Sequence, residues 1–261
     1  MSARTAMSLA PRPGAAPLPR MIAAQAVLET KMLLRNGEQL LLTVVIPTLL
    51  LVLFATVDIV DVKDTGAEES IDFLAPGVLA LAVMSTAFTG QAIATGFERR
   101  YGVLKRLGSS PLPRWALMTA KTLSVLVTEV LQVALLTVIA LALGWSPHGS
   151  PFAVFLLLLA GTAAFSGLGL LMAGTLKAEA TLAAANLVFL LLLVGGGVIV
   201  PLDKFPDGVR SVLELLPISA LSDGLRSVLQ DGAGMPWREL GILAVWAVLG
   251  LGAAGRLFRW E

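Results

Sequence analysis

Two groups of polar residues stand out in a chain that is otherwise strongly apolar. The first group lies in residues 97–114, where one acid, Glu98, accompanies five bases: Arg99, Arg100, Lys105, Arg106 and Arg114. The second is Glu129, with Gln132 one helical turn further on and on the same face. A basic segment suits docking to a soluble partner. A carboxylate within an apolar run suits contact with a substrate or a hydrogen bond between helices.

The residue inventory excludes several kinds of chemistry. The chain has no cysteine, which excludes disulfides and thiol chemistry, and its single histidine, His148, excludes a histidine-cluster metal site. No phosphate-binding loop of the form G-x-x-x-x-G-K-[ST] occurs, and no glycine is followed directly by lysine. We therefore expect no catalytic residue, no metal, no cofactor and no ATP hydrolysis in this chain.

The composition indicates an all-α integral membrane protein. Hydrophobic residues make up 56% of the chain and charged residues only 14%, with a mean hydropathy of +0.84. Soluble domains carry about a quarter charged residues, so this chain cannot cover a water-facing surface. Residues 1–20 are rich in Pro, Ala and Arg and contain no apolar signal-peptide core, which predicts a disordered cytoplasmic tail.

Six segments are apolar enough to cross the membrane as helices, which takes roughly 17–25 residues each. They are residues 39–57, 73–97, 115–143, 152–176, 180–200 and 240–255. No Asp, Glu, Lys or Arg occurs between Glu129 and Lys177, and the Gly- and Pro-rich residues 144–151 divide this run into a hairpin. The fifth segment contains Asn186, which we interpret either as a hydrogen-bonding residue between helices or as part of a translocation path.

The basic residues predict the orientation. Six spans put both termini on one side, and residues 1–39, 98–121, 177–179 and 256–261 hold 14 of the 19 Lys and Arg residues. The opposite side, residues 58–72 and 203–239, holds 12 of the 18 acids. By the positive-inside rule, both termini and residues 97–114 are cytoplasmic.

Two further segments are predicted to be helical without spanning the membrane. Apolar residues in 20–38 fall roughly on one side of a helix, which favours an amphipathic helix along the inner interface; the alternative is a helical extension of the first span. In residues 203–236, apolar residues recur at helical spacing on both sides of Pro217. This pattern predicts two short helices that dip into the membrane from the outer side, where their backbone must lie against protein or water.

Several short motifs occur together in a specific order. Residues 97–112 contain Glu98-Arg99-x-x-Gly102-x-Leu104, then Leu107 and Ser110-Pro111-Leu112. This pattern resembles the cytoplasmic signature of ABC-2 type permeases, the membrane subunits of ATP-driven exporters. Residues 73–77 are similar to the start of that family's second helix, and residues 197–206, 216–217 and 224–226 to its fifth-helix exit and outer re-entrant helices. Arg100 departs from the pattern, since many members carry an acid there.

The resemblance implies a six-helix transmembrane domain over residues 21–261 in a bacterial cell membrane, most similar to the short daunorubicin-resistance permeases. It implies export of a drug, lipid or glycolipid, powered by a separate ABC ATPase subunit that holds ATP and Mg. It also implies a dimer with a second copy or a different permease, contact with membrane lipids, and no nucleic acid. The residues expected to couple transport to the ATPase are Glu98, Arg99, Arg100, Gly102, Leu104, Lys105 and Arg106. Those expected to line the translocation path are Glu129, Gln132 and Asn186.

Two other classes of function stay open on the residues alone. An ion-coupled secondary carrier usually shows internal repeats and several charges within the membrane, whereas Glu129 is the one central charge found here. A membrane anchor for a cytosolic partner needs only the basic segment. Association with a P-loop ATPase distinguishes the exporter from the carrier, and nucleotide-dependent transport distinguishes it from the anchor.

Overall fold

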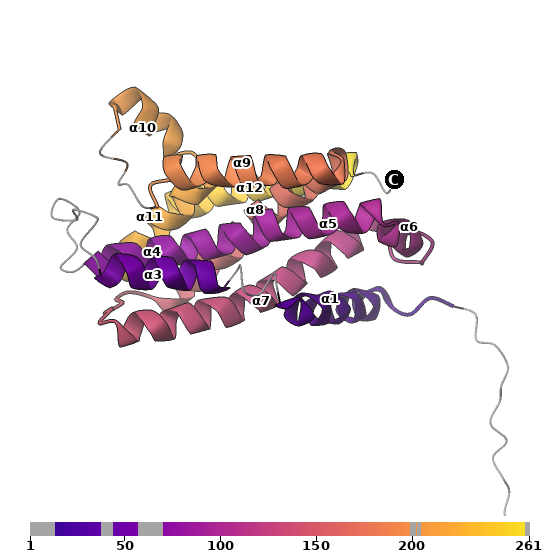
Figure 1. The fold of residues 1–261 in the computed structure, drawn as a ribbon, viewed down its shortest axis with the longest axis horizontal. Helices are drawn as coiled ribbons and strands as arrows, with labels where there is room; N and C mark the ends of the chain where they lie inside the picture. Colours follow the sequence, from indigo (N-terminus) through magenta and orange to yellow (C-terminus); the bar gives the residue numbers. More distant parts are fainter. Residues whose placement is uncertain (1–13, 38–43, 57–69, 199–201, 203–204, 259–261) are drawn as a thin grey trace, which may run out of the picture.

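The computed structural model describes residues 14–37, 44–56, 70–198, 202 and 205–258, and all regular elements in these ranges are helices. The long helices lie side by side, with α1 and α6 at one end and α10 at the other (Figure 1). In chain order the helices are α1 Leu18–Arg35, α3 Ile46–Thr56, α4 Ser70–Val83, η2 Met84–Gly90, α5 Gln91–Arg100, α6 Val103–Gly108, α7 Arg114–Ala142, α8 Pro151–Thr175, α9 Ala178–Gly195, α10 Asp207–Leu213, α11 Pro217–Leu229 and α12 Trp237–Leu257.

Five helices in the described ranges are long and apolar enough to cross a membrane. They are Ile71–Arg100, Arg114–Ala142, Pro151–Thr175, Ala178–Gly195 and Trp237–Leu257. These five correspond to the second to sixth predicted spans, so the all-α membrane class is confirmed. Of the first predicted span, only residues 44–56 are described, and α3 occupies most of that range. A six-span topology therefore stays a prediction.

The longest of these helices, Ile71–Arg100, contains a wide turn near its middle. The segment η2 is π-helical, with hydrogen bonds that run one residue further along the chain than in an α-helix. Gly169 of α8 lies directly against this segment, because a Cβ atom there would come within 2.8 Å of the Phe88 carbonyl oxygen. A glycine is thus required on α8 for its backbone to approach η2 so closely.

The two short amphipathic helices predicted in residues 203–236 are present as α10 and α11, and Pro217 begins the second of them. Arg226 anchors α11 to the rest of the molecule: its guanidinium donates hydrogen bonds of 2.8 Å to the carbonyl oxygens of Gly197 and Val198. It also lies 3.8 Å from the centre of the Phe73 ring, a cation–π contact. The start of α4 and the exit of α9 are therefore joined through one buried side chain. The depth of these helices in a membrane stays a prediction.

Candidate functional site

The predicted coupling residues form a helix–turn–helix at one end of the molecule. Helix α5 ends at Arg100, and α6 begins at Val103, with two residues between them. Between them, Gly102 adopts a left-handed conformation with φ of 70°, which glycine reaches without the steric cost of a Cβ atom. The position of this glycine in the signature therefore has a direct conformational reason.

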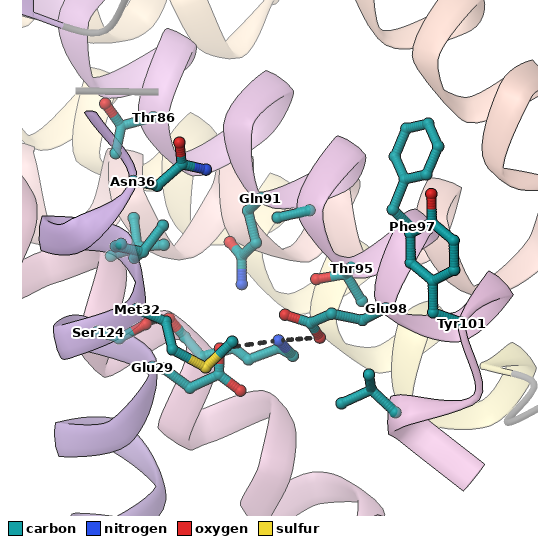
Figure 2. Close-up of a pocket in the computed structure, with 15 residues that line it drawn as sticks. Glu29, Met32, Asn36, Thr86, Gln91, Thr95, Phe97, Glu98, Tyr101 and Ser124 are labelled. Carbon is teal, nitrogen blue, oxygen red and sulfur yellow. Dashed lines mark hydrogen bonds and ion pairs between the residues drawn. The ribbon is translucent and has the colours of Figure 1, made fainter. Parts of the chain in front are cut away.

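Glu98 belongs to a buried cluster of three charges, here called the ion triad: Glu29, Glu98 and Lys121. The Lys121 Nζ atom lies 2.6 Å from Glu98 Oε2 and 3.1 Å from Glu29 Oε2. Glu29 and Glu98 approach this point from α1 and α5 (Figure 2), and Lys121 is supplied by α7. Removing Lys121 from this buried group would leave two facing carboxyl groups without their shared partner, so the lysine ties these three helices to one another.

The next two residues of α5 connect to a different part of the chain. Arg99 donates a hydrogen bond to the carbonyl oxygen of Leu176, at the end of α8. Arg100 forms an ion pair with Glu179, in the first turn of α9. Residues 98–100 therefore contact α1 and α7 on one side and the turn between α8 and α9 on the other. Arg100, the departure from the family pattern, has an acidic partner within this chain.

Helix α6 has an inward and an outward face. Leu104 is fully buried and packs with Leu117 of α7, Leu170 of α8 and Phe258 beyond α12. Lys105 and Arg106, the next two residues, are exposed. The predicted coupling residues thus divide into an inward group that contacts several helices and an outward pair of exposed bases.

Asn186 lies on a separate hollow along the side of the molecule, here called the membrane groove. The groove has a volume of about 810 Å³, and most of its lining is apolar. Its lining residues come from α3, from the Ile71–Arg100 helix and from α9, with Asn36 at the end of α1. Ser85, Thr89 and Asn186 supply polar atoms, and among the described residues the Asn186 amide has no hydrogen-bond partner. A groove of this size and lining suits an amphipathic organic molecule.

Glu129 and Gln132 lie between helices rather than on the membrane groove. Glu129 is only 3% exposed and accepts a hydrogen bond from Thr162 of α8. Gln132 accepts one of 2.9 Å from Thr86 of η2. These contacts connect α7 with α8 and with the π-helical segment. Both residues therefore make hydrogen bonds between helices. A role of either residue in transport stays a prediction.

The sequence prediction missed two members of the ion triad, Glu29 and Lys121. Lys121 carried a usable signal, because a lysine within an apolar span needs an acidic partner. The identity of that partner was hidden, since Glu29 is 92 residues away along the chain. Glu98 was identified from its motif, and its contact with Lys121 came only from the fold.

The helices, the charged end and the membrane groove define a multi-pass membrane permease, and comparisons with known proteins agree. The sequence profile of the ABC-2 type transporter family matches residues 24–229, and the chain belongs to this family. The chain is also similar to "Putative transport permease YvfS" of Bacillus subtilis (strain 168), with 27% identity over 233 residues. That match covers 86% of this chain and 91% of the relative. The family implies a non-enzymatic transmembrane subunit that partners with an ABC ATPase.

Proposed function

We propose that this chain is the membrane subunit of an ATP-driven exporter in the bacterial cell membrane, and that it moves hydrophobic or amphipathic molecules out of the cytoplasm. The observation that carries the proposal is that residues 98–106 have an inward and an outward side. Its outward bases, Lys105 and Arg106, are exposed, while Glu98, Arg99 and Arg100 contact α1, α7 and the α8–α9 turn. Force applied to α6 would therefore reach several helices at once.

The energy would come from a separate ABC ATPase subunit with its own ATP and Mg. An ATPase surface with exposed acids would complement Lys105 and Arg106, and such complementarity favours fast, specific association. Since α6 and both termini are expected to be cytoplasmic, this docking surface would face the compartment that holds ATP.

The membrane groove supports a second permease copy as a further partner. Asn186 is exposed halfway along the apolar helix α9, where lipid offers its amide no hydrogen bond. Leu187, Leu190 and Leu191 are exposed beside it. A second permease, identical or different, would cover this surface and turn two open grooves into one enclosed path. Drug, lipid and glycolipid all have the amphipathic character that the groove suits.

The test compares two charge reversals at the same end of the molecule. The permease is co-expressed with a tagged ABC ATPase encoded beside its gene, and co-purification is measured. In Arg106→Glu the two outward residues of α6 no longer carry a net positive charge, and we expect ATPase recovery to fall by about tenfold or more, since truncating hot-spot contacts commonly has this effect. Arg256→Glu makes the same charge change on an exposed residue of α12 and should retain the partner.

The transmission of motion from α6 to the other helices is tested separately from docking of the ATPase. Glu98→Lys puts a second cation beside Lys121 without altering the outward bases, so the ATPase should stay bound while ATP-dependent export falls by about tenfold or more. Unchanged export in this variant would contradict the proposal. Export that needs a proton gradient but no ATP would instead identify an ion-coupled carrier, and ATPase binding without any transport would identify an anchor.

A further inference from the structure

A second hollow, here called the inner pocket, lies at the α6 end of the molecule between α1, α5 and α7. Its volume is about 310 Å³, which is the size of a site for a small organic molecule. Met32 and Tyr101 line it and are 53% and 69% exposed, so the pocket opens at the surface between α1 and the end of α5. Figure 2 shows Glu29 and Met32 of α1 on one side and Glu98 and Phe97 of α5 on the other.

Acidic side chains outnumber basic ones in the inner pocket. Glu29 and Glu98 both contribute carboxyl groups to its lining, whereas Lys121 is the one basic residue among the described residues there. One lysine can balance one carboxylate charge, so a second ionised carboxylate would need a further cation. Arg100 does not supply a second positive charge here, because it is paired with Glu179 on the other side of α5.

Three hydrogen-bonding side chains line up on the face of α5 that borders this pocket. Gln91, Thr95 and Glu98 follow one another at the spacing of one helical turn. Gln91 is 5% exposed, yet neither atom of its amide has a hydrogen-bond partner in the described part of the chain. The same holds for the Thr95 hydroxyl, which is 1% exposed. Figure 2 shows the Gln91 amide pointing down toward Glu98.

Unpartnered buried polar groups are rare, because each one costs roughly 1–3 kcal/mol of lost hydration. Here they gather in one pocket with an excess carboxylate. Glu98 Oε2 accepts from Lys121, and its other oxygen has no partner among the described residues, so it is available to a further donor. Around these polar atoms the wall is apolar, with Leu33 and Val125 among its members.

We propose that the inner pocket is a binding site for a small amphipathic organic cation. A primary or secondary ammonium group would donate hydrogen bonds to Glu98 and to Gln91 or Thr95, and its charge would balance the second carboxylate. The apolar body would lie against Met32 and Phe97. An aromatic body also suits Phe97 and Tyr101, whose rings stack with centres 6.1 Å apart. The site is separate from the membrane groove, although the two share a wall that includes Ala94 and Phe97.

The test measures binding of 1-naphthylmethylamine to the full chain in phosphatidylcholine nanodiscs by calorimetry. Two probes of the same shape serve as controls: 1-naphthylmethanol, which is neutral, and 1-naphthoate, which is an anion. We expect saturable binding of one amine per chain, about tenfold or more tighter than the alcohol, and no saturable binding of the anion. Equal, non-saturating uptake of amine and alcohol means partition into lipid only and overturns the proposal.

Two variants locate the site. Glu98→Gln removes the excess charge while keeping an acceptor for Lys121, and Gln91→Leu removes the unpartnered amide at similar volume. Both should weaken amine binding by about tenfold, whereas Asp207→Asn on the distant helix α10 makes the same charge change and should leave binding unaltered. If Glu98→Gln lowers the unfolding temperature, Gln91→Leu carries the test. Wild-type affinity in folded Gln91→Leu overturns the site. Because no ATPase takes part, failure here leaves the proposed export function standing.

Discussion

At the scale of single residues, polar side chains in the interior of this protein connect helices that are far apart in the sequence. Glu129 contacts Thr162 across 33 residues, and Gln132 contacts Thr86 across 46. The Oε1 atom of Glu129 is buried and has no partner among the described residues. A carboxylate with a free oxygen can take up a proton or a donor from a passing molecule, so it has a capacity beyond packing.

We predict that Glu129→Gln lowers export by about tenfold or more while expression and ATPase binding persist. The substitution keeps the shape and the acceptor for Thr162 but removes the ionisable group. Export is measured in vesicles that contain the permease and its ATPase. Thr162→Val is the matched control, since it deletes the hydrogen bond and leaves the carboxyl group in place. Normal export by the Gln variant would show that Glu129 acts in packing alone.

The predicted coupling residues could be identified from the sequence, but which of them point inward and which point outward could not. Glu98 and Lys105 carry charge in the same motif, yet one is turned inward and the other outward. Glu98 is held inward by Lys121, which also contacts Glu29, and these two residues lie in other helices. A motif records which residues occur together, whereas orientation is set by partners that only the folded chain brings close.

At the scale of elements, Glu214 joins α10 to α12. It follows α10 directly, and its carboxylate accepts hydrogen bonds of 2.9 Å from Arg210 and from Arg238. The hydrogen bond from Arg238, followed by that from Arg210, holds the pKa of the Glu214 carboxyl below its ordinary value of 4.5. A lowered pKa means that folding favours the ionised form.

We predict that the contribution of these Glu214 interactions to stability is lost in acid. A carboxyl with a depressed pKa stabilises the fold fully above its unfolded pKa, and that contribution disappears as the pH falls through the folded pKa. The thermal unfolding midpoint of Glu214→Gln should therefore lie below that of the wild type at neutral pH and meet it in acid. The group is near the surface, so the difference in unfolding free energy should be less than about 1 kcal/mol. Asp207→Asn, in the first turn of α10, is the control; a Glu214→Gln difference that persists unchanged in acid would refute the prediction.

Helices were predictable in this chain because hydropathy and length dominate their formation in a membrane. The predicted break at residues 144–151 separates α7 from α8, which begins at Pro151, and Pro217 begins α11. The π-helical segment η2 was not predictable. Its residues are ordinary for an apolar helix, and its wide turn depends on close packing against Gly169 of α8.

At the scale of the whole molecule, the two ends differ in character. Figure 1 shows α6 at one end and α10 at the other. We predict that a cysteine at Ser211, on α10, reacts with an impermeant maleimide on intact cells, whereas one at Ser109, just after α6, reacts only after lysis. Both serines are exposed, and the chain contains no cysteine of its own to interfere. The measurement is gel-shift labelling before and after permeabilisation, and the reverse pattern would invert the assigned orientation.

The wide turn of η2 also sets the rotational phase of everything that follows it in the same helix. Each residue of an α-helix advances the chain by about 100° around the axis, so one additional residue accommodated in a π turn rotates the next segment by that amount relative to a regular helix. Glu98 faces Lys121 because α5 leaves η2 at the angle seen here. If residues 84–90 were wound as a regular α-helix with no residue removed, Glu98 would turn roughly a quarter-circle away from Lys121, even though every residue of the coupling motif remained. A relative that has the same number of residues but lacks the wide turn would therefore need its acid one position earlier in the chain to reach the same lysine.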